Sequence, residues 1–136
     1  MGKLLAIDLG NTRAKAGVFL NGKLIQRVLF ECSAPEPLEK LLTQHKIDEA
    51  ILSSVVENHF AIERIVSNYT ILNTLQSISN YPIRNKYKTP ETLGADRLAC
   101  AVGASVIFPG KNVLSIDAGT CIKYDIVDRS GSYLGG

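Results

Sequence analysis

The sequence has few cysteines, little excess of charge of either sign and no long hydrophobic run. Its net charge of +2 over 136 residues is too small to indicate a nucleic-acid-binding protein or attachment to an anionic membrane. No segment approaches the roughly 20 consecutive apolar residues that a membrane-spanning helix needs. The apolar stretch that begins at Leu4 ends at Asp8, too early for the core of a signal peptide. We therefore expect neither nucleic acid nor a membrane as a partner.

The three cysteines, Cys32, Cys100 and Cys121, are odd in number and follow no metal-ligand spacing. They indicate a reducing, cytoplasmic location rather than a disulfide framework. Apolar residues make up 46% of the chain and charged residues 21%, which is typical of an ordinary globular protein.

A short motif occurs twice in the chain. Each copy consists of an apolar, strand-like stretch, then Asp-x-Gly, then a threonine. The first copy covers residues 4–12 and the second covers residues 113–120. A second strand-like stretch and a further turn follow each copy, at Asn21-Gly22 and at residues 128–131. The repeated unit is therefore predicted to be strand, tight glycine turn, strand, turn, strand. Two such units that face each other across a cleft can hold the phosphates of a nucleotide.

The repeat also predicts the domain organisation. Asp117 repeats Asp8 109 positions later, so a second unit as long as the first would run well past residue 200. We expect residues 1–111 to form a first lobe and residues 112–136 to form the opening hairpin of an incomplete second lobe. The chain is thus interpreted as a fragment of a longer protein, or as a protein that has lost its second lobe.

The segments between the two copies are typical of an α/β fold. Asn21-Gly22 predicts a hairpin turn, and residues 35–42 combine prolines with a leucine stripe that predicts a short helix. A strand is expected over residues 50–56, a helix capped by Asn58 comes next, and a short strand is expected over residues 70–75. Strands that alternate with helices in this way favour a mixed sheet with flanking helices.

Residues 80–88 are expected to be a loop that carries Tyr87. Thr89-Pro90 then predicts a helix start, Gly94 interrupts that helix, and a second helix begins near Ala95. Pro109-Gly110 is expected to end it.

The first Asp-x-Gly turn has the residue types of a phosphate site. Gly10 lets the backbone approach an anion closely, Asn11 and Thr12 add side-chain donors, and Lys15 adds a cation. Asp8 would repel phosphate, so we expect it to hold a metal ion or the water ligands of one. For a single copy, an ordinary hairpin turn is the better explanation, because Asp, Gly and Asn are common turn residues. The second copy shifts the interpretation toward phosphate binding.

The segment Gly94-Ala95-Asp96-Arg97 places a carboxylate and a guanidinium at the predicted start of a helix. The carboxylate of Asp96 is suited to accept a proton from an attacking hydroxyl in phosphoryl transfer, where positioning matters more than a strong base. The alternative is a charged first helical turn with a solvated arginine.

Five segments together resemble the type III pantothenate kinases. They are Asp8-x-Gly-Asn-Thr, Tyr87 with Pro90 and residues 94–97, Val102-Gly103-Ala104, Asp117-x-Gly-Thr, and residues 133–136 (Tyr-Leu-Gly-Gly). They span the chain from residue 3 to its end in the order of that family. The resemblance implies the superfamily of acetate and sugar kinases, actin and heat-shock chaperones, whose members are built from two ribonuclease-H-like domains. Here the second, duplicated domain would be truncated.

The resemblance implies transfer of the ATP γ-phosphate to the 4′-hydroxyl of pantothenate, the first step of coenzyme A synthesis. Asp96 would be the proton acceptor, and pantothenate would be bound by Tyr87, Gly94, Ala95, Asp96 and Arg97. Asp117 would ligate a monovalent cation, K⁺ or NH₄⁺, and Mg²⁺ would accompany ATP. A homodimer is expected, with the substrate site completed across its interface. ATP would be bound by Asp8, Leu9, Gly10, Asn11, Thr12, Arg13, Ala14, Lys15 and Thr120.

Two departures from the family pattern stand out. The family continues for roughly another hundred residues, and Cys121-Ile122-Lys123 stands where small residues and threonine are commoner. We expect Lys123 to face solvent on its strand. The alternatives to an active kinase are a non-catalytic nucleotide-binding regulator of the same fold, a sugar or acetate kinase of the superfamily, or an inactive fragment. The pair Asp96 and Arg97 argues against a regulator, since a regulator needs no base.

Overall fold

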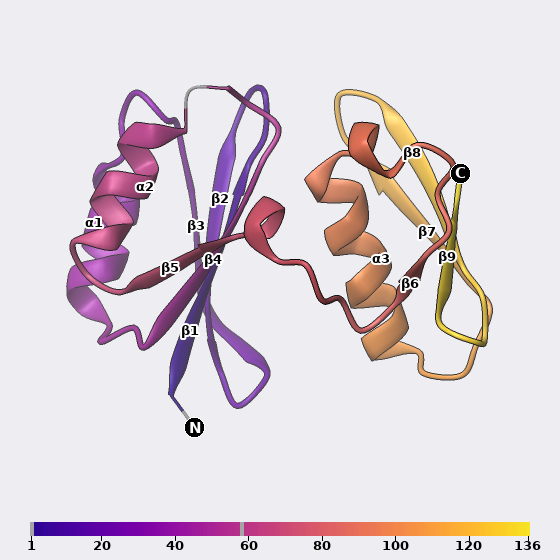
Figure 1. Ribbon diagram of the computed structural model, residues 1–136. Coiled ribbons are helices and arrows are strands. Elements are labelled where there is room, and N and C mark those ends of the chain that lie inside the picture. Colours follow the sequence, from indigo (N-terminus) through magenta and orange to yellow (C-terminus); the bar gives the residue numbers. More distant parts are fainter. Residues whose placement is uncertain (1, 58) are drawn as a thin grey trace. The chain divides into compact units, whose positions relative to one another are not determined.

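The computed structural model describes residues 2–57 and 59–136, which form two compact units, Met1–Ile78 and Ser79–Gly136. Figure 1 traces the first unit in indigo to magenta and the second mainly in orange and yellow. These units are defined by contacts within the chain, whereas the boundary at 111/112 was inferred from the repeated motif. The division into a first lobe of residues 1–111 and a hairpin of residues 112–136 therefore stays a prediction.

The first unit is built on a five-stranded mixed sheet with the order β3-β2-β1-β4-β5. Strands β1, β2 and β3 form an antiparallel meander, and β4 and β5 continue from β1 in parallel. The predicted turn between β2 and β3 is confirmed, because Asn21 and Gly22 both have positive φ, 51° and 75°. The strands are β1 (Lys3–Leu9), β2 (Ala14–Leu20), β3 (Lys23–Phe30), β4 (Glu49–Ser54) and β5 (Ile71–Thr74).

Helices α1 (Glu36–Gln44) and α2 (Phe60–Ser67) lie on the same side of this sheet (Figure 1). The leucine stripe of α1 is buried, as predicted, and Ile62 and Val66 of α2 join the same apolar core. Phe60, at the start of α2, is exposed. The predicted cap Asn58 lies outside the described residues. A single 3₁₀ turn, η1 (Leu75–Ser77), ends the unit.

The second unit is a four-stranded sheet with the order β6-β9-β8-β7, and α3 packs on β7 and β8. Its elements are β6 (Arg84–Asn85), the 3₁₀ turn η2 (Pro90–Thr92), α3 (Ala95–Ile107), β7 (Val113–Ala118), β8 (Ile122–Val127) and β9 (Ser132–Gly135). Strands β7, β8 and β9 repeat the antiparallel meander of β1, β2 and β3, which confirms the predicted repeat of strand and turn.

Two local predictions for this unit were wrong. Residues 80–88 are not entirely loop, because Arg84 and Asn85 pair in parallel with Ser132 and Tyr133 of β9. This pairing joins residues 48 positions apart, so the local sequence does not reveal it. The helix expected at Thr89-Pro90 is only the 3₁₀ turn η2, which ends before Gly94.

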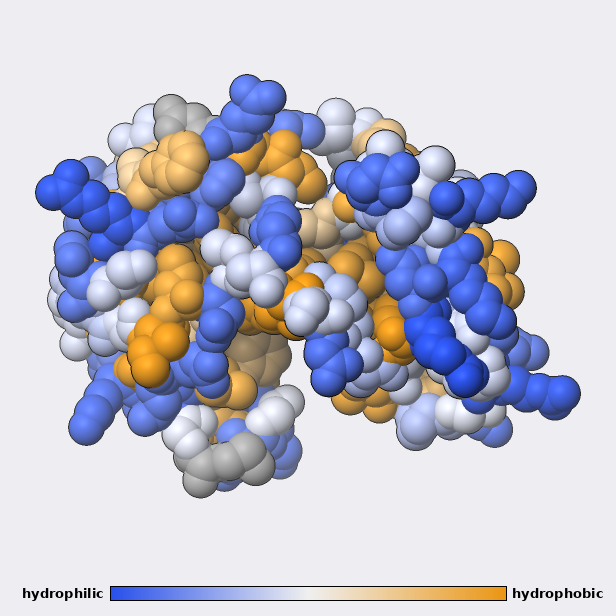
Figure 2. Space-filling view, viewed as in Figure 1, coloured by the Kyte–Doolittle hydropathy of each residue, from blue (hydrophilic) through white to orange (hydrophobic). Residues whose placement is uncertain are grey.

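The two faces of β8 differ in burial, and the apolar side chains are mostly on the exposed face. Lys123, Asp125 and Val127 alternate on the more buried face, whereas Ile122, Tyr124 and Ile126 are 42–60% exposed on the other. On the face drawn in Figure 2, hydrophilic side chains cover much of the area, with hydrophobic areas between them. No helix in the described ranges is long and apolar enough to cross a membrane.

Candidate active site

The two Asp-x-Gly turns join equivalent pairs of strands. In the first turn the Gly10 N–H donates to the Arg13 carbonyl at 3.2 Å, and in the second the Gly119 N–H donates to the Cys121 carbonyl at 3.1 Å. Four residues separate the paired ends of β1 and β2, and three separate those of β7 and β8. The lysine follows the aspartate by seven residues in the first copy and by six in the second. This difference matches the shorter second turn, so Lys15 pairs with Asp8 and Lys123 pairs with Asp117 across the two ladders.

The first turn is open to solvent. Lys15 Nζ lies 3.9 Å from Asp8 Oδ2, and the two side chains are 65% and 46% exposed. Asn11, Thr12 and Arg13 are exposed, whereas Leu9 and Ala14 are buried in the core and can offer a ligand only their backbone. A Cβ on Gly10 would lie 3.0 Å from the Arg13 carbonyl oxygen, so this tight turn favours glycine.

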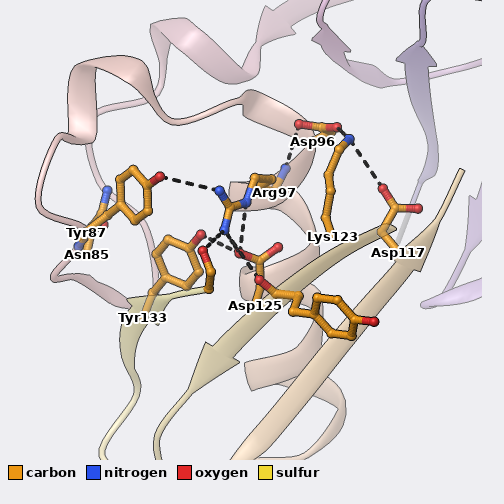
Figure 3. A network of polar contacts seen from close by, with 10 residues as sticks. Asn85, Tyr87, Asp96, Arg97, Asp117, Lys123, Asp125 and Tyr133 are labelled. Carbon is orange, nitrogen blue, oxygen red and sulfur yellow. Dashed lines mark hydrogen bonds and ion pairs between the residues drawn. The ribbon is translucent and has the colours of Figure 1, made fainter. Parts of the chain in front are cut away.

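The second turn carries Thr120 and Cys121, both exposed, and its lysine makes different contacts. Lys123 Nζ donates to Asp96 Oδ2 and lies 3.5 Å from Asp117 Oδ2 (Figure 3). The prediction that Lys123 faces solvent was therefore wrong. The alternation of β8 puts Lys123 on the same face as the buried Asp125 and Val127, which is the face that α3 covers.

Asp96 lies in the first turn of α3, directly after its first residue Ala95. Its Oδ1 accepts a hydrogen bond from the Arg97 backbone N–H at 2.9 Å, and its Oδ2 accepts from Lys123. A Cβ on Gly94 would lie only 2.6 Å from Asp96 Oδ1. Glycine at this position therefore leaves room for the carboxylate over the helix start. The side chain of Asp96 is 18% exposed, so the group is partly shielded but still reachable.

Arg97 is held by a buried carboxylate that the sequence reasoning missed. Its Nε and Nη2 donate to Asp125 Oδ1 at 3.0 and 2.6 Å, and the Tyr133 hydroxyl donates to the same oxygen at 2.6 Å. Asp125 is 1% exposed and Tyr133 is 0% exposed. The alternation of β8 was the available signal, because it places Asp125 two residues from the buried Val127.

Tyr87 completes this cluster (Figure 3). Its ring lies under the Arg97 guanidinium, 5.3 Å from ring centroid to Cζ, and its hydroxyl accepts from Nη1 at 3.4 Å. The Tyr87 backbone N–H donates to Asn85 Oδ1 at 2.9 Å, which anchors the segment next to β6. The structure thus brings together Tyr87, Asp96 and Arg97, three of the predicted substrate residues.

The electrostatics of the cluster favour charged Arg97 and neutral Tyr133. The hydrogen bonds that Arg97 donates to Asp125 raise the pKa of Arg97, although burial opposes this. Burial raises the pKa of the Tyr133 hydroxyl, and its bond to Asp125 adds to the effect. The bond to Asp96 raises the pKa of Lys123, against a smaller opposing effect of burial. The site therefore presents two cations, Arg97 and Lys123, and two reachable carboxylates, Asp96 and Asp117, an arrangement suited to hydroxyl-bearing or charged ligands.

Comparison with known proteins identifies close sequence relatives. The chain matches the model of the type III pantothenate kinase family over residues 4–136. It is 38% identical over 133 residues to a type III pantothenate kinase of Bacteroides fragilis, and 41% identical over 134 residues to one of Christiangramia forsetii. Each alignment covers 97% of this chain and 55% of the relative, so the chain spans about half the length of the curated relatives it matches.

Solved structures with similar folds are more distant in sequence. The ROK hexokinase of Thermus thermophilus aligns with a TM-score of 0.51 at 17% identity, covering 98% of this chain and 48% of that one. The Lmo2764 protein of Listeria monocytogenes aligns with a TM-score of 0.51 at 15% identity, covering 96% and 48%. These likenesses confirm the predicted fold, a mixed sheet with flanking helices. Because the family model covers nearly all of the sequence, the chain belongs to the type III pantothenate kinase family.

Proposed function

We propose that this chain is the first part of an enzyme that transfers the γ-phosphoryl group of ATP to the 4′-hydroxyl of pantothenate. The observation that carries the proposal is that Asp96 and Arg97 lie next to each other at the start of α3, in a chain that belongs to this kinase family. The reaction would begin coenzyme A biosynthesis.

Asp96 is the proposed proton acceptor. Each carboxylate oxygen has two lone pairs, so one bond from the Arg97 backbone and one from Lys123 leave capacity for a substrate hydroxyl. The hydroxyl oxygen attacks the γ-phosphorus, the bond from that phosphorus to the bridging oxygen of ADP breaks, and the hydroxyl proton passes to Asp96. Since the transition state of phosphoryl transfer is loose, holding the hydroxyl in line matters more than a strong base.

Arg97 and Tyr87 are proposed to bind the acidic substrate. Asp125 takes up the inner edge of the guanidinium through Nε and Nη2, and Nη1 points toward the Tyr87 hydroxyl. A guanidinium fixed in this way loses little side-chain entropy when it binds a carboxylate or amide oxygen. Gly94 and Ala95 would supply backbone contacts at the same helix start.

The ATP phosphates are proposed to bind at the two glycine turns. The first turn would contribute residues 8–15 and the second would contribute Thr120. Mg²⁺ bound to ATP would be held through Asp8 or its water ligands. The resemblance also assigns a monovalent cation to Asp117, and it implies a cytoplasmic homodimer.

The test is pantothenate-dependent ADP release, measured for the 136-residue chain and for a version extended through the downstream reading frame. We expect activity in the extended protein, and we expect Asp96→Asn to lower its rate by about 10²–10⁴-fold. Glu91→Gln is the matched control, because it removes the charge of an exposed carboxylate in η2 and should leave the rate unchanged.

The outcomes separate the alternatives. Activity in the extended protein alone would mean that the 136-residue chain is an inactive fragment of the kinase. A folded extended protein that binds ATP but never releases ADP with pantothenate would favour the non-catalytic regulator. Turnover of a sugar or acetate in place of pantothenate would assign another kinase of the superfamily.

A further inference from the structure

The surroundings of Asp117 differ from those of a carboxylate that awaits a metal ion. Asp117 pairs with Lys123 across the β7–β8 ladder, and Lys123 Nζ lies 3.5 Å from its Oδ2. The same ammonium group bonds Asp96 Oδ2. Figure 3 shows the Lys123 side chain rising from β8 to end between the two carboxylates. One lysine therefore supplies the positive charge for an aspartate of β7 and for an aspartate of α3.

These residues do not fit a further monovalent cation at Asp117. A K⁺ or NH₄⁺ ion bound to that carboxylate would lie beside the Lys123 ammonium and be repelled by it. The expectation of a bound K⁺ or NH₄⁺ at Asp117 therefore disagrees with the contacts of this chain.

We propose that Lys123 provides, from within the chain, the single positive charge at Asp96 and Asp117, so that the enzyme works without added monovalent cation. The inference rests on the kinase function proposed above. It makes Lys123 a positioning residue for the base Asp96.

The geometry of the ammonium group supports this role. It carries the same charge as K⁺ or NH₄⁺ and has three N–H donors, one of which bonds Asp96, while Asp117 lies at ion-pair distance. The Lys123 side chain is 30% exposed, so its ammonium group is partly shielded from solvent. An ion pair in such a place is stronger than one at a fully exposed surface. The raised pKa of Lys123 keeps the group charged at neutral pH.

The first experiment compares rates of the extended protein in KCl, NH₄Cl and tetramethylammonium chloride at constant ionic strength. We expect the unmodified protein to show the same rate in all three salts. Lys123→Ala should be slower by about 10–100-fold in tetramethylammonium, which is the expected loss of a charged hydrogen bond, and should recover in NH₄Cl, KCl or methylammonium chloride. Lys111→Ala removes an exposed lysine of the same unit and should be independent of the cation.

The second experiment does not depend on catalysis. Thermal unfolding without substrates should show that NH₄Cl and KCl stabilise Lys123→Ala over tetramethylammonium chloride, whereas the unmodified protein and Lys111→Ala show no such difference. If Lys123→Ala does not fold, Lys123→Thr gives the same test with a hydroxyl in place of the ammonium. Cation-specific stabilisation without pantothenate turnover would overturn the kinase proposal and support the role of Lys123.

Two results would overturn the role of Lys123. The first is an unmodified protein whose rate rises severalfold with K⁺ or NH₄⁺ over tetramethylammonium. The second is a folded Lys123→Ala or Lys123→Thr variant that shows no cation-specific change in either rate or unfolding temperature.

Discussion

The two copies of the Asp-x-Gly unit share a backbone and an Asp–Lys pair but differ in the surroundings of that pair. In the first copy Asp8 and Lys15 meet loosely in solvent, 3.9 Å apart. In the second copy, the Lys123 ammonium bonds Asp96 of α3 and also lies near Asp117. The same register thus gives an exposed ion pair in one unit and, in the other, a three-residue network whose lysine and Asp96 are partly buried. What decides the chemistry is the element packed against the strand, not the motif.

A second difference lies two residues further along each returning strand. By register, Asp125 of β8 corresponds to Gly17 of β2, since they pair with Ser115 and Ala6 at equivalent places in the ladders. Gly17 adds no side chain to its unit, whereas Asp125 is a fully buried carboxylate that holds Arg97 and Tyr133. The second unit therefore depends on a polar centre, while the core of the first is apolar.

The largest effect on stability is expected for Asp125→Ala. The change leaves the Arg97 guanidinium, itself only 19% exposed, without its carboxylate and removes the acceptor of the Tyr133 hydroxyl. Breaking a buried ion pair in this way costs about 3–5 kcal/mol of unfolding free energy. Urea unfolding followed by tyrosine fluorescence would measure it, because four of the five tyrosines lie in the second unit and the chain has no tryptophan.

Gly17→Ala tests the same position in the first copy and should leave the tyrosine signal of the second unit unchanged. A loss below about 1 kcal/mol for Asp125→Ala would contradict the dependence of the second unit on a polar centre.

The next effect compares the two lysines directly. Lys123→Met leaves Asp96 without a charged partner, and we expect a loss of about 1–3 kcal/mol in unfolding free energy. Lys15→Met breaks only an exposed pair and should change stability by less than about 0.5 kcal/mol. Thermal unfolding of the two variants under one buffer condition measures the difference. Equal losses would mean that the packing of α3 adds nothing to the second pair.

These comparisons also show how far the sequence predicts the structure. The antiparallel meanders, the Asn21-Gly22 turn and the stripe of α1 follow from local periodicity and turn chemistry, and all are present. The parallel strand β6 was missed because its partner β9 is distant in sequence. Local pattern also misplaced Lys123, because the apolar Ile122, Tyr124 and Ile126 suggest the buried face of β8 but lie on its exposed side.

The site shows the same division. Asp96 and Arg97 were predicted from the contiguous segment 94–97, and Tyr87 was predicted from the family resemblance; the three do lie together. Asp125 was missed because a lone aspartate in a strand gives no local signal of its partner, which comes from a helix 28 residues earlier. The proposed ATP contacts of residues 8–15 and Thr120 stay predictions, since they depend on a ligand.

A smaller effect is expected at alkaline pH and should be confined to the second unit. Burial raises the pKa of Tyr133 above its ordinary value of 10.0, so the unfolded chain loses this proton at a lower pH than the folded chain. The stability that neutral Tyr133 contributes is thus complete below about pH 10 and is lost as pH rises further. The difference in unfolding free energy between the unmodified protein and Tyr133→Phe, measured from pH 8 to pH 11, should narrow above about pH 10. A constant difference would argue against burial of the neutral hydroxyl.

The smallest effect concerns the second turn of each unit. The turn between β2 and β3 is formed by the backbone conformations of Asn21 and Gly22. In the turn between β8 and β9, the Asp128 carboxylate instead accepts hydrogen bonds from the backbone N–H groups of Ser130 and Ser132, at 2.8 and 3.0 Å. Hydrogen bonds from Ser130 and Ser132 lower the pKa of Asp128 below 3.8, so this stabilisation is present above that pH and is lost as pH falls through the lowered value. Asp128→Ala should therefore lower the unfolding temperature slightly at pH 7 and less at pH 3, by a smaller margin than Lys123→Met. Since the Asn21-Gly22 turn has no such carboxylate, hydrogen exchange should show the loss at residues 128–132 and not at residues 20–23. Equal exchange changes at both turns would mean that the carboxylate does not set the second one.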